Sequence, residues 1–521
     1  MKAVKRRAVA GVLVGSLVLA GCGKNDHPVG QGGSPAVPKQ MVLKVATADT
    51  VTSLDPAGPY EIGSRTLQAN VFQTLLTITP DKPTPVPDAA DCQYDAPTIY
   101  TCSLKKGLTF PNGHELTSSD VKFSFDRMLK LKTPGGPAGL FSSVASVTTP
   151  DELTAVFNLK KPDARLPYLL TTTAASIVDE QFYPTTKLLN DTAMGSGPYE
   201  LTSYKAGRQA VLTKFKGYRG ARGALNDGVD LSFVRDSAAL TQAVSTGKVD
   251  LALHGFGPSD LAKLRTGETV QVVEAESAET RFFSFNFKSA IARRPAVRRA
   301  VAQLVDRPAI VKKAYADSVT PLYSVVPPGF GGHLDSFKTE YKEPNKAAAT
   351  AILREGGMIG AVTLTIGWTP THYGPGAKAE ALELKRQLDA SGLFKVNLRG
   401  LEWPQYQQQI RAGAFDAYLA GWTPEYPDSD DYLVPIVREG AVFQNAYRSQ
   451  TANKLMDQEI AEQNQLDRER LLENLQGVLA HDVPALPTWQ GRLTVVAGRD
   501  VENVGATLNP LSFVYFSALR K

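Results

Sequence analysis

Residues 415–433 of the chain read FDAYLAGWTPEYPDSDDYL. The first six place Phe, Ala and Leu on one side and Asp, Tyr and Ala on the other, a period of two that is typical of a sheet strand with unequal faces. We expect Gly421 to end this strand, and the loop behind it mixes prolines, aromatic rings and carboxylates. Proline stiffens a loop, the rings supply flat apolar area and the acids supply negative charge. Such a mixture at a strand end predicts a site for a small cationic or zwitterionic ligand.

The alternative for this loop is a solvated acidic turn whose tryptophan fills a gap in the core. Composition alone favours that alternative, and the pair Asp430-Asp431 is of a kind common on solvated turns. The choice between the two therefore depends on the rest of the chain.

Upstream of the loop, strand patterns alternate with helix patterns. The segments are residues 362–366, 379–388, 396–398, 406–411 and 415–420. This alternation predicts the α/β class, in which helices cover a sheet. At 521 residues the chain is too long for one core, so we expect two or three domains.

The composition is that of a soluble globular protein, with 43% hydrophobic and 21% charged residues. Four of the positive charges (Lys2, Lys5, Arg6 and Arg7) lie in the first seven residues. Without them the formal net charge of +5 falls to +1. A body so close to neutral gives no electrostatic case for nucleic acid as a partner.

The first residues form a targeting segment. Residues 1–21 combine a basic start with an apolar run at 8–20 that is too short for a membrane span, which predicts a signal peptide. The run ends in LAGC at residues 19–22, which resembles a bacterial lipobox and implies a diacylglycerol anchor on Cys22. The alternative is an ordinary signal peptide with an incidental cysteine. Residues 22–40 are then a flexible tether.

Two further cysteines, Cys92 and Cys102, flank a short segment. In an exported chain such a pair predicts a disulfide that closes a hairpin-like loop. Two buried free thiols are the alternative.

Residues 100–127 read YTCSLKKGLTFPNGHELTSSDVKFSFDR. An alternating strand leads to the tight-turn signal Asn112-Gly113, and Thr117 with Asp120 three residues on forms a capping-box-like helix start. This run resembles the family 5 solute-binding proteins of ABC transporters, which bind dipeptides and oligopeptides. Further motifs of that family follow in the family's order, at residues 194–199, 243–251, 285–286, 297–307, 421–428, 467–470 and 482–484.

The resemblance implies a bilobal α/β fold of the periplasmic-binding-protein type (type II, family 5). The first lobe would comprise residues 41–277 and 492–521, with an extra subdomain at about 59–190, and the second lobe residues 278–491. We expect a hinge of two chain crossings, near 277–283 and 486–492, that lets the lobes close over a ligand.

Catalytic and metal-binding motifs are missing from the sequence. It contains no GxSxG, HExxH, P-loop or GxGxxG pattern, and its six histidines form no i, i+4 pair. We therefore expect neither an enzyme nor a bound metal or cofactor.

The resemblance places the ligand against the loop after Gly421. Its position for pairing with a peptide's α-ammonium is Glu425, where the family usually has aspartate. We expect Trp422, Trp403, Tyr426 and Asp428 to complete the site. The predicted function is that of an extracytoplasmic, lipid-anchored monomer that delivers an oligopeptide to an ABC permease. A sugar or small metabolite as the ligand, or a nonspecific chaperone-like binder, is the alternative.

Overall fold

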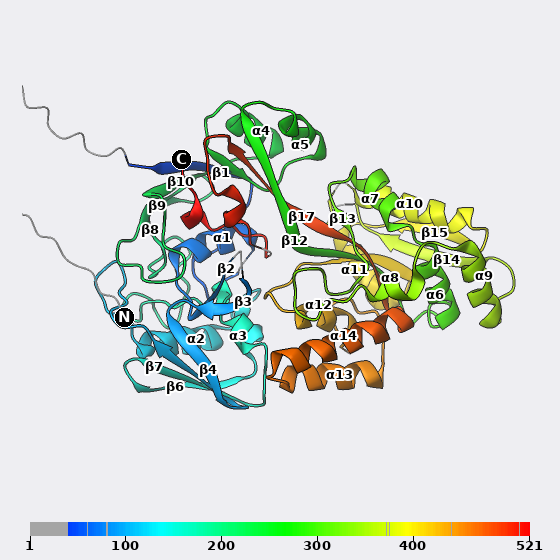
Figure 1. Cartoon of the computed structure of the whole chain (residues 1–521), viewed down its shortest axis with the longest axis horizontal. Coiled ribbons are helices and arrows are strands. Elements are labelled where there is room, and N and C mark those ends of the chain that lie inside the picture. Colours follow the sequence, from blue (N-terminus) through cyan, green and yellow to red (C-terminus); the bar gives the residue numbers. More distant parts are fainter. Residues whose placement is uncertain are drawn as a thin grey trace, which may run out of the picture. The chain divides into compact units, whose positions relative to one another are not determined.

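Two long antiparallel strands, β12 (Val270–Phe285) and β17 (Ala485–Gly498), lie side by side through the largest sheet of the computed structural model (Figure 1). The structure describes residues 40–521, apart from residues 60, 80, 81, 371, 375, 439 and 510 and the side chains of residues 82, 83 and 258. The expected signal peptide, the anchor cysteine Cys22 and nearly all of the tether lie outside the described residues.

The strands of this sheet come from distant parts of the sequence. Their order is β15 (Phe394–Gly400), β14 (Val362–Trp368), β16 (Ala417–Trp422), β12, β17, β11 (Leu251–Leu253), β1 (Val42–Thr47), β10 (Gly228–Phe233), β9 (Gln209–Lys214) and β8 (Tyr199–Lys205), with β13 (Thr320–Pro321) beside β17. Parallel pairs such as β14–β15 and β1–β10 require helical crossovers, as the α/β class predicts.

The β12–β17 pairing changes register twice, between Glu276 and Thr280 and again between Arg281 and Phe282. Val270–Glu276 pair with Arg492–Gly498, and the ladder resumes at Thr280 opposite Gln490. Gly491 stands opposite the irregular residues 277–279, where an added Cβ would lie 2.7 Å from Ser277 Oγ. A side chain at position 491 would therefore crowd the side chains of Ser277 and Glu279. The hinge crossings expected near residues 277–283 and 486–492 include these irregular residues, and the hinge stays a prediction.

A second sheet of four antiparallel strands forms a separate layer. Its order is β4 (Ala90–Ala96), β5 (Ile99–Leu104), β7 (Thr154–Leu159) and β6 (Val144–Asp151). A disulfide joins Cys92 on β4 to Cys102 on β5. The hairpin β2 (Leu76–Thr79) and β3 (Lys82–Pro87) lies beside this sheet. Helix α2 (Ser118–Leu131) covers one face of the sheet and begins with the expected capping box of Thr117 and Asp120.

The remaining helices are α1 (Ile62–Val71), α3 (Leu166–Leu169), α4 (Ser237–Ser245), α5 (Pro258–Arg265), α6 (Pro295–Leu304), α7 (Arg307–Tyr315), α8 (Ser336–Tyr341), α9 (Lys346–Glu355), α10 (Ala377–Ala390), α11 (Trp403–Ala412), α12 (Asp430–Val437), α13 (Gln450–Ala461) and α14 (Gln465–Asp482). Short 3₁₀ turns occur at Pro137–Phe141, Thr173–Ala175, Val504–Thr507 and Phe516–Ala518. The largest hydrophobic core packs α6 to α14 against β12, β14, β16 and β17, and the four-stranded sheet has a core of its own. No helix among the described residues is long and apolar enough to span a membrane.

Two local expectations about residues 415–433 are wrong. The strand does not end at Gly421 but continues to Trp422, because β12 extends beside it and Thr280 pairs with Trp422. Its faces are not unequal either: Ala417 to Ala420 are all buried, since β16 is an interior strand between β14 and β12.

Candidate functional site

The loop that follows β16 begins beside the β12–β17 crossing. Trp422 pairs with Thr280, close to where the register changes, and α12 begins at Asp430. Residues 423–429 therefore run from the crossing toward the four-stranded sheet, and Tyr426 packs into the core of that sheet. A loop held at both ends in this way presents its side chains in a fixed geometry.

Trp422, at the end of β16, and Glu425, in the loop, each have a polar group without a partner among the described residues. Trp422 is half-buried, and its Nε1 is buried without a hydrogen-bond partner among the described residues. Glu425 is half-buried too, and its backbone N–H donates to Asp431 Oδ2. Within the described part of the chain, its carboxylate makes no hydrogen bond or ion pair. The loop thus offers one uncommitted donor and one uncommitted anion, a pair that suits an ammonium group next to a carbonyl.

Tyr426 is held inside the protein. Its hydroxyl donates to Asp430 Oδ2 at 2.6 Å, and Arg165 Nη1 lies 3.2 Å from the same oxygen. The guanidinium of Arg165, which precedes α3, also donates two hydrogen bonds to Asp163, and the backbone N–H of Arg165 donates a third. Burial raises the pKa of Asp163, but the hydrogen bonds and charge of Arg165 outweigh it and lower the pKa overall. Tyr426 therefore fastens the loop to α3.

Asp428 is committed to a buried salt bridge. Arg468 on α14 donates to both of its carboxylate oxygens at 2.7 Å, and Arg468 Nη2 also lies 2.9 Å from Glu459 Oε2. The Arg468 side chain is 2% exposed. A bidentate pair of this kind fixes the backbone of the loop but leaves little of Asp428 for a ligand.

Two carboxyl groups meet behind this loop, for which a solvated acidic turn was the alternative favoured by composition alone. Asp430 and Glu459 are both fully buried, and Asp430 Oδ1 and Glu459 Oε1 each lack a donor among the described residues. Burial, and then the neighbouring Asp430, raise the pKa of Glu459 well above its ordinary value. Burial also raises the pKa of Asp431 strongly. Asp430 and Asp431 are therefore interior groups rather than solvated ones.

Trp403 lies in a different cluster, at the first turn of α11. Its ring stacks on His372 at 3.6 Å between centroids and meets Tyr373 edge-on. Tyr373 covers the guanidinium of Arg281, which pairs with Gly421 across the sheet. Because successive residues of a strand point to opposite faces, Trp422 lies on the face away from this cluster. The structure brings Trp403 near Gly421 but does not place it against Trp422.

Arg281 marks a buried charged group that the sequence did not indicate. Its Nε donates to Glu380 Oε2 at 3.1 Å, and both of its Nη atoms are buried without partners among the described residues. Glu279, on the irregular segment of β12, lies near this pair, and burial raises its pKa. The sequence pattern of a strand shows which residues are apolar. It does not show which distant carboxylate a buried arginine contacts, so the pairing of Arg281 with Glu380 could not be predicted from neighbouring residues.

One cluster has the residue types of a metal site. His114, Asp120 and Asp179 bring one ligand atom each to within 4.8 Å of one another. The carboxylate oxygens of Asp120 accept hydrogen bonds from the backbone N–H groups of Thr117 and Glu180, and Asp179 accepts one from the backbone N–H of Gln181. The cluster is thus an internal hydrogen-bond network at the start of α2.

Comparison with known proteins places the chain among solute-binding proteins. A family model described as bacterial extracellular solute-binding proteins, family 5, middle, matches residues 84–444. The chain is 24% identical to the probable D,D-dipeptide-binding periplasmic protein DdpA of Escherichia coli, over 91% of this chain and 93% of that protein. It is also 24% identical to the dipeptide-binding protein DppE of Bacillus subtilis, over 94% of each.

Among solved structures, HbpA2 from Haemophilus parasuis superposes with a TM-score of 0.83 at 20% identity, covering 92% of this chain and 99% of that one. This likeness, together with the family match, confirms the expected bilobal α/β fold of the type II class.

Proposed function

Since the chain belongs to family 5 of the bacterial extracellular solute-binding proteins, we propose that it captures a solute between two lobes and delivers it to the permease subunits of an ABC importer. A dipeptide or oligopeptide is the favoured solute, because the relatives DdpA and DppE carry dipeptide-binding names. A sugar or small metabolite is the alternative ligand for the same role, and a nonspecific chaperone-like binder is the alternative from another class.

The observation that carries this proposal is the carboxylate of Glu425, which makes no hydrogen bond or ion pair among the described residues and lies three residues after the unpartnered indole N–H of Trp422. A peptide's first residue has an ammonium group and a carbonyl oxygen in close succession, which match this anion and this donor. Lobe closure would remove water from the pair, and a desolvated cation without its partner is costly. In this proposal Tyr426 and Asp428 hold the loop, and Trp403 stands as a further candidate contact.

Calorimetric titration with trialanine tests the pairing. Glu425→Gln should weaken binding tenfold or more, since each decade of affinity corresponds to about 1.4 kcal/mol. N-acetyl-trialanine should bind wild type as weakly as trialanine binds the variant, because both changes delete the same interaction. Glu355→Gln, an exposed acid at the end of α9, is the matched control and should bind like wild type. Equal affinity of Glu425→Gln and wild type would end the proposal.

The anchor is part of the same proposal. Cys22 would carry the lipid after cleavage behind residue 21, with residues 22–40 as the tether between membrane and binding domain. Wild type should then partition with membranes, and Cys22→Ala should remain unlipidated and uncleaved at that site. Mass spectrometry that found an unmodified Cys22 within the mature wild-type protein would rule the anchor out.

The lobe boundaries follow from the strand crossings. We assign residues 41–277 and 492–521 to the first lobe, with a subdomain at about 59–190, and residues 278–491 to the second. The register change between Glu276 and Thr280, opposite Gly491, supports this division. The protein would act as a monomer that needs no cofactor, since capture and release by closure require none.

A further inference from the structure

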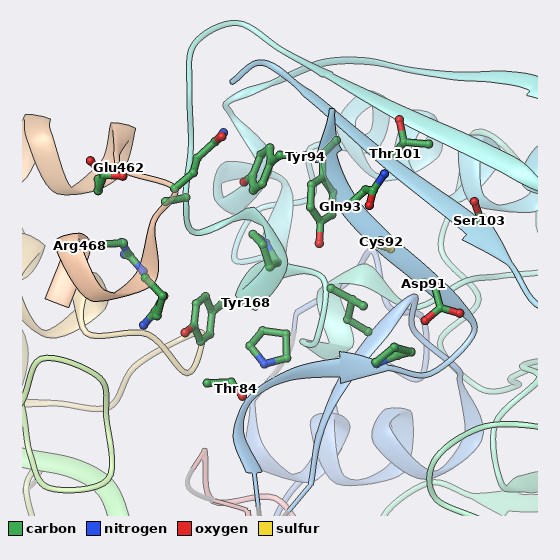
Figure 2. A pocket seen from close by; sticks show the side chains of 18 residues that line it. Thr84, Asp91, Cys92, Gln93, Tyr94, Thr101, Ser103, Tyr168, Glu462 and Arg468 are labelled. Carbon is green, nitrogen blue, oxygen red and sulfur yellow. The ribbon is translucent and has the colours of Figure 1, made fainter. Parts of the chain in front are cut away.

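A cavity of about 720 Å³ opens where the four-stranded sheet meets the α13–α14 turn. Figure 2 shows Asp91, Cys92 and Gln93 of β4 on one side of it and Glu462 and Arg468 on the other. Thr84 and neighbouring prolines of β3, with Tyr168 of α3, complete the wall. Its volume is in the range of pockets that hold small ligands or peptide segments. Trp422 and Glu425 do not line it.

The wall formed by β4 is a free strand edge. β4 is the last strand of its sheet, so no described strand pairs on its other side. The Cα atoms of Cys92 and Cys102 lie 4.1 Å apart, the short spacing of a non-hydrogen-bonded pair in an antiparallel ladder. The N–H and C=O of Cys92, and by the two-residue repeat those of Tyr94, therefore point away from β5. These groups face the open edge.

The facing strand β3 is unsuited to pair with that edge. Its residues Pro85 and Pro87 line the same cavity and have no backbone N–H to donate. Because β3 and β4 cannot form a complete hydrogen-bond ladder with each other, a gap remains between them. On the β4 side of this gap, backbone N–H donors and C=O acceptors are still available.

The side chains of the cavity favour a basic, extended ligand. The rings of Tyr94 and Tyr100 pack in a tilted arrangement with 4.5 Å between their centroids, and Tyr168 adds a third ring to the lining. Asp91 has no ion pair among the described residues, and Glu462 accepts a hydrogen bond only from the backbone of Asn464 there. The positive charge of Arg468 is already matched by Asp428. The rim is therefore negative, and the floor is aromatic.

We propose that the free edge of β4 binds a basic peptide segment in extended conformation, as an added strand beside Cys92 and Tyr94. Added strands gain affinity from main-chain hydrogen bonds and selectivity from pockets for alternate side chains. The aromatic floor and acidic rim supply those pockets. This site is separate from the one proposed at Glu425 and does not depend on it.

The test uses the full-length protein and the peptide acetyl-Lys-Val-Thr-Val-Thr-Lys-amide, which lacks the α-ammonium that Glu425 would bind. N-methylation at residues 2 and 4, or at residues 3 and 5, removes main-chain donors from one edge of the peptide at a time. Strand addition requires that one methylated peptide loses affinity tenfold or more while the other stays within twofold of the parent. Equal loss for both, or no loss for either, would overturn the proposal.

Charge reversal supplies the second arm. The double variant Asp91→Lys with Glu462→Lys should bind the parent peptide tenfold or more weakly than wild type does, because both acids line the cavity. Glu355→Lys with Glu473→Lys changes the net charge equally at residues that do not line the cavity and is the matched control. Thermal unfolding checks that each double variant is folded. If the control weakens binding as much, or if Glu425→Gln abolishes binding of this acetylated peptide, no separate site exists at β4. Trialanine binding is measured independently, so failure here leaves the proposed function unaffected.

Discussion

At the scale of single residues, the contact between Asp430 and Glu459 requires a proton. Both side chains are fully buried, and each has one oxygen without a donor among the described residues. The groups that face them are Asp428, Arg468 and Arg165, with Asp163 behind Arg165. Two guanidinium groups cannot neutralise four carboxylates, so at least one carboxyl group retains its proton. Burial, and then the charge of Asp430, place that proton on Glu459 by raising its pKa well above the usual range.

This proton makes stability depend on pH. Between the ordinary pKa of an unfolded glutamate, about 4.3, and the raised folded pKa, the folded chain holds a proton that the unfolded chain has lost. The free energy of unfolding therefore falls as pH rises through that window. Glu459→Gln keeps the shape without the titration and should flatten the dependence by up to about 1.4 kcal/mol per pH unit. Urea unfolding of wild type and Glu459→Gln at pH 5, 6, 7 and 8 measures how the free energy of unfolding of each depends on pH.

Glu473→Gln on α14, whose carboxylate makes no described ion pair, is the control and should keep the wild-type slope. Parallel curves for wild type and Glu459→Gln would show that the proton is held elsewhere.

At the scale of elements, the β12–β17 crossing depends on Gly491. A Cβ there would lie 2.7 Å from Ser277 Oγ and 3.2 Å from Glu279 Cβ. Gly491→Ala should therefore destabilise the fold by about 1–3 kcal/mol, the usual cost of overpacking. Adding Ser277→Ala removes the nearer contact and should recover part of the loss. Denaturant unfolding of the four chains of this double-mutant cycle measures the coupling.

Gly477 provides the contrast. It lies within α14, and a Cβ there would meet nothing within 4 Å. Gly477→Ala should stabilise the protein by up to about 1 kcal/mol, through helix propensity alone. If Gly491→Ala and Gly477→Ala changed the free energy of unfolding by the same amount, steric crowding at Gly491 would be excluded as the cause of the change.

The disulfide of the β4–β5 hairpin should contribute modestly. Cys92 and Cys102 are 10 residues apart in sequence, and closing so short a loop restricts the unfolded chain by about 2–3 kcal/mol in the entropy model. Reduction should lower the stability of wild type by up to this amount and leave Cys92→Ala with Cys102→Ala unchanged. Two reactive thiols in the unreduced, denatured protein would contradict the bond.

Elements whose signals are local could be predicted from the sequence. The capping box at Thr117 and the alternation that gives β14, α10, β15, α11 and β16 depend on neighbouring residues, and the structure contains them. Contacts between distant segments could not be predicted. Tyr426 was predicted to contact the ligand, because no residue near it in the sequence indicates that its ring packs in the core of the four-stranded sheet. Asp428 looked available because its partner Arg468 lies 40 residues further along.

At the scale of the whole molecule, the proposed hinge of two strand crossings makes lobe closure the expected response to a ligand. A ligand that binds the closed state better shifts the population toward it, and the shift cannot exceed the differential affinity. Trialanine at about 100 times its dissociation constant should therefore stabilise the fold by about 2.7 kcal/mol and raise the melting temperature. Small-angle scattering should show a smaller radius of gyration in the same samples. A chaperone-like binder would hold peptide without contraction, so tight binding at constant radius would favour that alternative. At a trialanine concentration equal to the wild-type dissociation constant, wild type is about half occupied and a tenfold weaker Glu425→Gln is about one-tenth occupied, so the variant should stay closer to the radius of the free protein.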